Sequence, residues 1–133
     1  MRVAVIGNKE WQNKQKVQDT LLNLKRQFGN EVIVVGAGGT EGANYMIRKF
    51  TLEFGIKYEE YNPSYSGRNL YSALPPSYYG KKYHFSQLLH RMRILAENCE
   101  YMIILNNENK LNPQLKTAYT RITKLEKPVV ILG

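Results

Sequence analysis

Short apolar runs alternate with amphipathic stretches along the whole chain. Five runs of four to eight residues predict strands at 2–6, 31–35, 56–61, 100–105 and 128–132. Apolar positions spaced by about 3.6 residues predict helices at 14–28, 43–54, 84–98 and 113–124. The strand at 56–61 is more polar than the others, which places it nearer an edge. This alternation predicts an α/β fold with a single Rossmann-like doubly wound parallel sheet of about five strands, order 3-2-1-4-5, and helices on both faces.

The length of 133 residues is typical of one domain, and no repeat or linker divides it. We therefore expect residues 1–133 to form a single domain. Residues 62–83 lack a predicted element and are rich in proline, glycine and tyrosine. So long a connection inside a compact domain is unusual and often functional.

The chain carries 19 Lys and Arg against 11 Asp and Glu, a formal net charge of +8. This surplus favours anionic partners such as nucleotides, nucleic acid or an acidic protein, with solubility alone as the alternative. No run of about 18 apolar residues predicts a membrane span, and the start does not read as a secretory signal, so we expect a protein of the cytoplasm, or of the host cytoplasm if viral. The lone Cys99 is expected in the core, and no zinc-type spacing occurs, so neither a metal nor a cofactor is predicted.

Ligands of doubly wound sheets bind beyond the carboxyl ends of the strands, where the strand order reverses. The first strand ends at Gly7-Asn8-Lys9-Glu10-Trp11, the second at a glycine-rich loop, and the fourth at Asn106-Asn107. These segments are expected to meet at one edge of the sheet.

The glycine loop, residues 36–42, is the sharpest feature. It comprises Gly36, Ala37, Gly38, Gly39, Thr40, Glu41 and Gly42 and leads directly into a helix. Free backbone N–H groups at the start of a helix favour a phosphate, although a tight turn without ligand is the alternative. The loop matches neither the dinucleotide fingerprint nor the Walker A motif. An acid beside a phosphate repels it, so Glu41 faces a ribose hydroxyl or acts as a catalytic carboxylate.

Two further features point to the same edge. The tyrosines of 62–83 lie among Arg68, Lys81 and Lys82, and such a mixture suits a base and its phosphate, or else a lid or subunit contact. Trp11 either stacks on a base or anchors the first loop. Arg91, in the first turns of the helix at 84–98, either neutralises a phosphate or belongs to a solvated face.

These segments resemble the SLOG superfamily of Rossmann-like nucleotide-binding proteins, which includes lonely-guy-like phosphoribohydrolases and the DNA-processing DprA proteins. The YspA-like (YpsA-related) branch is the most similar, and members found in phage make a phage-encoded protein one origin that the resemblance implies. Its opening Gly-Ser-Arg-x-Trp segment is similar to Gly7–Trp11, and its Gly-Ala-Asp at a helix start is similar to Gly42-Ala43-Asn44. A later Gly-Lys corresponds to Gly80-Lys81, and Arg91 stands nine residues before Glu100, as the arginine of the family motif does.

This chain also departs from the family. Asn44 replaces an acid, Met92 replaces an asparagine, and Asn106–Lys110 stands where many relatives have a glycine-rich turn. The phosphoribohydrolase signature, Pro-Gly-Gly-x-Gly-Thr-x-x-Glu, is absent there. The resemblance therefore implies nucleotide binding more strongly than N-glycosidic hydrolysis.

Three functions follow as hypotheses, beside the alternative of an interaction protein whose fold holds no ligand. The first is a sensor or sequestering protein that binds a nucleotide or ADP-ribose-like ligand through the residues Gly7, Asn8, Lys9, Trp11, Gly36, Gly38, Gly39, Thr40, Gly42, Asn44, Lys81 and Arg91. The second is a nucleoside monophosphate N-glycosidase with Glu41 as catalytic carboxylate. The third is a DNA- or RNA-binding module of the DprA type. We also expect a homo-oligomer and no membrane partner.

Overall fold

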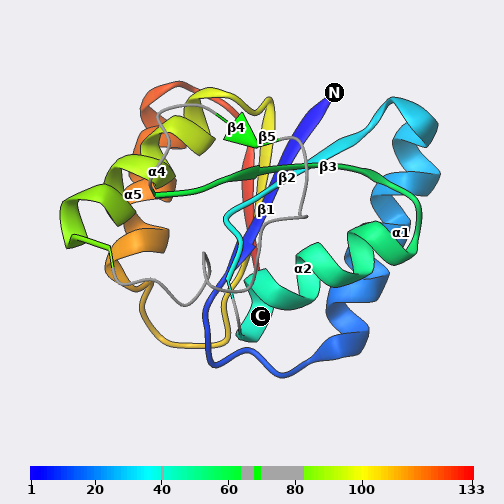
Figure 1. Ribbon diagram of the computed structural model, residues 1–133, viewed down its shortest axis with the longest axis horizontal. Coiled ribbons are helices and arrows are strands. Elements are labelled where there is room, and N and C mark those ends of the chain that lie inside the picture. Colours follow the sequence, from blue (N-terminus) through cyan, green and yellow to red (C-terminus); the bar gives the residue numbers. More distant parts are fainter. Residues whose placement is uncertain (40, 64–67, 70–82) are drawn as a thin grey trace.

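The computed structural model describes residues 1–39, 41–63, 68–69 and 83–133. Its strands are β1 Arg2–Gly7, β2 Ile33–Gly36, β3 Lys57–Tyr61, β4 Arg68–Asn69, β5 Tyr101–Leu105 and β6 Val129–Leu132. Its helices are α1 Lys14–Phe28, α2 Gly42–Glu53, α4 Phe85–Glu97 and α5 Pro113–Lys124, with a short 3-10 turn at Gly29–Glu31. Figure 1 shows these α-helices flanking the sheet.

The predicted sheet is confirmed. The strand order is β4-β3-β2-β1-β5-β6, and the five longer strands pair in parallel, which is the predicted order 3-2-1-4-5. The sequence did not predict β4, a two-residue strand that pairs antiparallel with the end of β3. Strand β2 also begins two residues later than predicted, because Gly29 ends α1 at a positive φ of 64° and the chain makes a 3-10 turn first.

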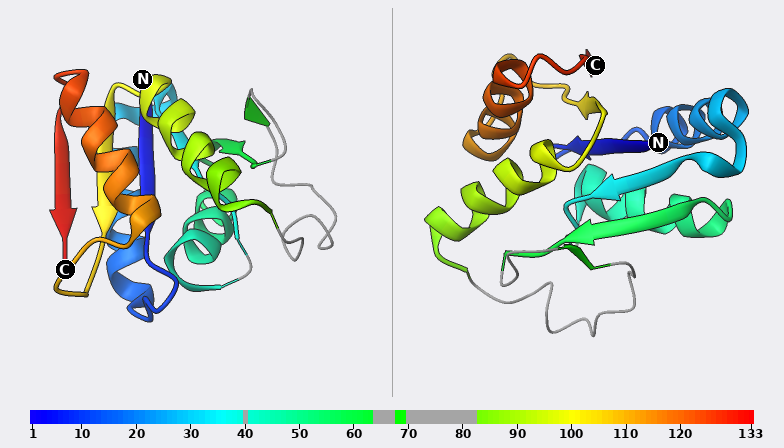
Figure 2. Two further views of the ribbon diagram at one scale, coloured as in Figure 1. Left: turned by 90° about the vertical axis from the view of Figure 1, so that its left-hand side faces the viewer. Right: turned by 90° about the horizontal axis from the view of Figure 1, so that it is seen from above.

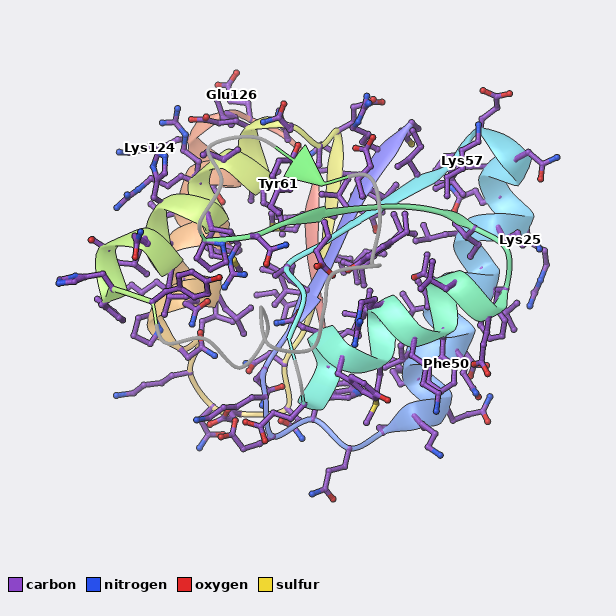
Figure 3. All side chains as sticks on the ribbon, in the orientation of Figure 1. Lys25, Phe50, Lys57, Tyr61, Lys124 and Glu126 are labelled. Carbon is purple, nitrogen blue, oxygen red and sulfur yellow. The ribbon has the colours of Figure 1, made fainter. Side chains whose placement is uncertain are left out.

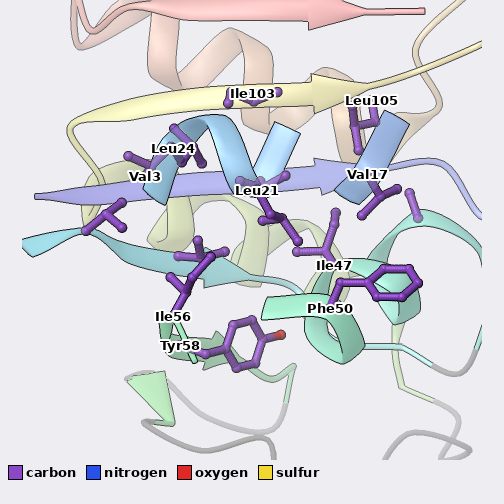
Figure 4. Packing of buried hydrophobic residues seen from close by; sticks show 14 of the residues in the cluster. Val3, Val17, Leu21, Leu24, Ile47, Phe50, Ile56, Tyr58, Ile103 and Leu105 are labelled. Atoms are coloured by element: carbon purple, nitrogen blue, oxygen red, sulfur yellow. The ribbon is translucent and has the colours of Figure 1, made fainter. Parts of the chain in front are cut away.

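Figure 2 shows helices on both faces of the sheet. A hydrophobic cluster lies on each face. Helices α1 and α2 cover one face, where Leu21 and Ile47 belong to the same cluster as Val3 of β1 (Figure 4). Val5 of β1 is also a member of this cluster. Helices α4 and α5 cover the other face. The alternation of buried side chains in β1 between the two clusters explains why its sequence is apolar at every position. Buried Cys99 belongs to the second cluster, as predicted.

Asparagine caps set two helix starts. The Asn13 side chain accepts a hydrogen bond from the N–H of Lys16 at 3.1 Å, and that of Asn112 accepts one from Leu115 at 2.9 Å. Pro113 then occupies the first turn of α5, where its missing N–H costs nothing. None of the helices in the described part of the chain has the length and apolar character needed to cross a bilayer.

Candidate functional site at the carboxyl edge of the sheet

A pocket opens where the strand order reverses. The chain leaves β1 towards β2 and β3, then returns to β5 on the other side, so the reversal lies between β1 and β5. The pocket has a volume of about 300 Å³ and is lined by Lys9, Glu10, Phe85, Glu108, Asn112, Pro113 and Gln114. These residues come from the loops after β1 and β5 and from the first turns of α4 and α5. We call this the β1–β5 pocket.

Hydrogen bonds and a close backbone contact connect the loop after β1 to the start of α2. The N–H of Gly7 donates to the Asn44 side-chain oxygen at 3.1 Å, and the N–H of Ala43 donates to the carbonyl oxygen of Asn8 at 3.1 Å. A Cβ added at Gly42 would lie 2.3 Å from the Lys9 carbonyl oxygen, and φ at Gly42 is +70°. The predicted site residues in these two segments therefore pack on one another, which explains Gly42 without a ligand.

Asn8 also ties the loop after β1 to the loop after β5. Its side-chain nitrogen donates to Asn107 Oδ1 and to Glu108 Oε1, both at 2.8 Å. Asn106 donates to the carbonyl oxygen of Glu108 at 3.0 Å. The side-chain oxygens of Asn8 and Asn106 are buried and meet no donor among the described residues. The polar groups at the reversal are thus fixed in orientation but incompletely satisfied.

Two glycines of the loop make room for side chains of β3. A Cβ at Gly36 would lie 2.6 Å from the Tyr58 hydroxyl oxygen, and one at Gly38 would lie 2.8 Å from the Glu60 carboxyl carbon. Tyr58 donates a hydrogen bond of 2.7 Å to Glu60, and Asn62 donates a second of 3.3 Å. Glu60 is fully buried. The close approach of β3 therefore accounts for Gly36 and Gly38, whereas a Cβ at Gly39 would meet only Asn44, at 3.6 Å.

The N–H groups in the middle of the glycine loop remain available. Among the described residues, none accepts a hydrogen bond from the N–H of Gly38, Gly39 or Glu41, while Thr40 lies outside the described residues. Glu41 is exposed and its side chain makes no capping hydrogen bond to α2. The β1–β5 pocket does not include a residue of this loop.

Arg91 is buried beneath the glycine loop rather than on a solvated helix face. Its guanidinium donates to the carbonyl oxygen of Ala37 at 2.6 Å, to that of Tyr61 at 3.5 Å, and to Gln114 Oε1 at 2.8 Å. No carboxylate of a described residue lies within 4.0 Å of it. Burial lowers the pKa of Arg91 to about 10, and the charge of Glu60 opposes this shift. At neutral pH it remains a cation, and its hydrogen bonds connect the glycine loop, the end of β3 and the start of α5.

Other predicted residues lie elsewhere. Trp11 is 2% exposed in the core, and its indole N–H donates to the carbonyl oxygen of Asn13 at 2.9 Å. It anchors the first loop, and base stacking by Trp11 is not compatible with this burial. Lys9 is exposed and lines the pocket. Lys81 and the tyrosines between 64 and 82 lie outside the described residues.

The sequence analysis missed most of the pocket lining. Phe85 is 55% exposed at the first turn of α4 and lines the pocket. Glu108 lies in a polar loop and Gln114 at a helix start, and neither segment is rich in glycine. Their position could have indicated a role, because Asn112-Pro113 marks a helix start at the predicted carboxyl edge of the sheet. No group of three potential metal-ligating side chains occurs within the described ranges.

Comparisons with known proteins address the fold. No family model matches the chain, and no curated protein matches it in sequence. Among solved structures, it is similar to the molybdenum cofactor carrier protein of Chlamydomonas reinhardtii, with a TM-score of 0.63 and 17% identity. The match covers 99% of this chain and 76% of the carrier protein. By its structure and by this likeness, the chain has a Rossmann-like α/β fold.

Proposed function

We propose that this chain binds a small nucleotide-like ligand at the carboxyl edge of its sheet and acts as a sensor or sequestering protein. The observation that carries the proposal is the position of the β1–β5 pocket, at the point where the strand order reverses. Open α/β sheets bind their ligands at this point. The volume of about 300 Å³ lies at the lower end of the range for small-molecule sites.

The anionic end of the ligand belongs at the glycine loop. The N–H groups of Gly38, Gly39 and Glu41 meet no acceptor among the described residues. Glu41 is the N-cap of α2, where the helix dipole favours negative charge, and the two glycines precede it in the loop. Arg91 supports this role indirectly, because its hydrogen bond to Ala37 fixes the loop from below. We therefore treat Arg91 as a positioning residue.

The uncharged part of the ligand belongs in the β1–β5 pocket. Phe85 offers an exposed ring for stacking, and Glu10 and Glu108 are acceptors suited to ribose hydroxyls or amino groups. Lys9 is the cation that the described part of the chain contributes to the lining. The two parts are adjacent, because the Lys9 main chain packs on Gly42 and Arg91 joins Ala37 to Gln114. The solved structure to which this chain is similar is that of a cofactor carrier protein, and this similarity is consistent with binding of a small ligand. The resemblance to the SLOG superfamily makes a nucleotide or ADP-ribose-like molecule the first choice.

Isothermal titration calorimetry against AMP, ADP-ribose and cyclic nucleotides tests the proposal. We expect one of them to bind, and Lys9→Gln to weaken that binding about tenfold through loss of a charge-assisted hydrogen bond. Lys14→Gln, an exposed lysine outside the pocket, is the matched control and leaves binding unchanged. A folded protein that gives no heat with any of these nucleotides contradicts the proposal.

The same samples separate a binder from an enzyme. Chromatography of the nucleotide after long incubation shows whether free base is released. Release that Glu41→Gln abolishes supports the N-glycosidase alternative, with Glu41 as the catalytic carboxylate. An intact nucleotide after incubation supports a sensor or sequestering role.

A further inference from the structure

A second hollow runs along the outer side of α4 and α5. It has a volume of about 440 Å³ and is lined by Arg93, Pro113, Lys116, Thr117, Thr120, Arg121 and Lys124. We call it the α4–α5 groove. It shares only Pro113 with the β1–β5 pocket, so the ligand proposed above does not account for it.

The groove carries a concentrated positive charge. Four of its seven lining residues are cationic, and among the described residues the one carboxylate that forms an ion pair with them is that of Glu97, 2.6 Å from an Arg121 nitrogen. Another nitrogen of Arg121, Nε, is buried without an acceptor among the described residues. A surplus of three charges over such a short stretch of surface attracts anions at physiological ionic strength, because the charges lie within about one Debye length of one another.

Two of the cations and one hydroxyl form a row along α5. Lys116, Thr120 and Lys124 stand four residues apart on α5, so they follow one another at intervals of about 6 Å. The Thr120 hydroxyl makes no hydrogen bond to a described residue and can donate to an anion. Thr117 differs, because its hydroxyl already donates to the carbonyl oxygen of Pro113 at 2.8 Å. A row of donors along the helix fits a ligand with regularly repeated anionic groups.

We propose that the α4–α5 groove binds the phosphate backbone of a single-stranded nucleic acid. Positively charged grooves that follow the backbone are the usual electrostatic component of single-strand binding. The described residues that line the α4–α5 groove include no large apolar side chain, whereas a docked peptide needs buried apolar anchors. A phosphodiester chain needs only the charges and the hydroxyl that the groove supplies.

Fluorescence anisotropy with a labelled oligothymidylate of about twenty nucleotides tests this proposal. For a strand that contacts the four cations of the groove, the logarithm of affinity falls with the logarithm of salt concentration with a slope of about −3. The double variant Lys116→Gln/Lys124→Gln removes two contacts, so we expect the slope to become shallower by about 1.4.

A matched control separates the groove from the overall charge. Lys25→Gln/Lys57→Gln removes the same charge at two exposed lysines, and Figure 3 shows both beside α1, far from Lys124. We expect this variant to keep the slope of the unmodified protein. Equal losses in the two variants, or no anisotropy change at about 50 mM salt, overturn the proposal.

Two competitors identify the anion. Tripolyphosphate, which shares the row of phosphates but has no nucleosides, is expected to compete weakly, and polyglutamate is expected not to compete. Displacement by polyglutamate as effective as by the unlabelled strand overturns the proposal in favour of an acidic protein partner. None of the four lysines tested lines the β1–β5 pocket, so loss of nucleotide binding there and failure of this proposal are separate results.

Discussion

Arg91 and Ala37, 54 positions apart in the sequence, are joined by a hydrogen bond of 2.6 Å from the guanidinium to the carbonyl oxygen. The bond connects α4 to the glycine loop across the end of the sheet. A second nitrogen of the same guanidinium holds Gln114 at the start of α5. One buried side chain thus sets the relative positions of the loop and the pocket lining.

Replacement of Arg91 by lysine is therefore expected to destabilise the protein, although the charge is kept. A lysine ammonium lacks the planar fork and does not satisfy acceptors in Ala37, Tyr61 and Gln114 together, which predicts a loss of about 1–3 kcal/mol in the free energy of unfolding. Urea denaturation measures the loss. Arg93→Lys, two residues further on an exposed part of α4, is expected to change stability by less than about 0.5 kcal/mol. Equal midpoints for the two variants contradict this interpretation of Arg91.

Substitution at Gly42 tests the contact between the loop after β1 and α2. Gly42→Ala places a methyl group 2.3 Å from the Lys9 carbonyl oxygen and requires a positive φ. Gly55→Ala requires a nearly identical φ of +69° but meets nothing within 4 Å, so it isolates the conformational cost of about 1–2 kcal/mol. We expect Gly42→Ala to lose clearly more than Gly55→Ala in thermal or urea unfolding. A similar loss of unfolding free energy in both variants would show that the loop after β1 shifts at little cost to accommodate the added methyl group.

Two ion pairs of similar length provide a test of burial. Arg2 and Glu59 lie 2.8 Å apart with the Glu59 side chain 6% exposed, whereas Arg121 and Glu97 lie 2.6 Å apart with both side chains about 40% exposed. The hydrogen bond to Glu59 raises the pKa of Arg2. Double-mutant cycles with Gln substitutions are expected to give a coupling energy above about 1 kcal/mol for the first pair and about 0.5 kcal/mol for the second. The reverse order excludes burial as the deciding factor.

Alkaline pH is expected to destabilise the fold through Cys99. Burial raises the pKa of its thiol to about 11 from an ordinary value of 9.0. The unfolded chain therefore loses this proton first, so the contribution of the thiol is fully present below about pH 9 and is lost as the pH rises towards about 11. The loss amounts to roughly 2–3 kcal/mol.

Comparison with Cys99→Ala isolates this effect. Burial lowers the pKa of Arg91 to about 10, so Arg91 acts in the opposite direction above that pH, but it does so in both proteins and cancels. The stability difference between the protein and the variant is expected to shrink between about pH 9 and pH 11 in urea unfolding. A difference that stays constant with pH shows that the thiol does not ionise on unfolding.

The sequence predicted the architecture because the strands are apolar on both faces. The valines and isoleucines of β1 and β5 admit few positions other than the centre of a parallel sheet, and the order of the five long strands followed from the alternation with helices. The polar strand β3 was harder, since its two acids are buried against Arg2 and Tyr58 rather than exposed at an edge.

The site was less predictable because its residues depend on neighbours remote in sequence. The glycine count of the 36–42 loop predicted a phosphate cradle, yet three of its glycines are explained by contacts with Tyr58, Glu60 and Lys9. The burial of Arg91 follows from three acceptors on three other segments, and no local pattern encodes them. The position of the edge was predictable from topology, whereas the roles of single side chains were not.

The contact between Gly36 and the ring of Tyr58 also constrains how this chain can change over time. Gly36 lies at the end of β2 without a positive φ, so only the neighbouring ring excludes a side chain there. Alanine at position 36 is therefore acceptable once position 58 holds a smaller residue that lacks the hydroxyl, and the acid at position 60 then loses the hydrogen bond that Tyr58 donates. Positions 36, 58 and 60 should consequently be inherited as a set, with substitutions appearing together across descendants rather than one at a time.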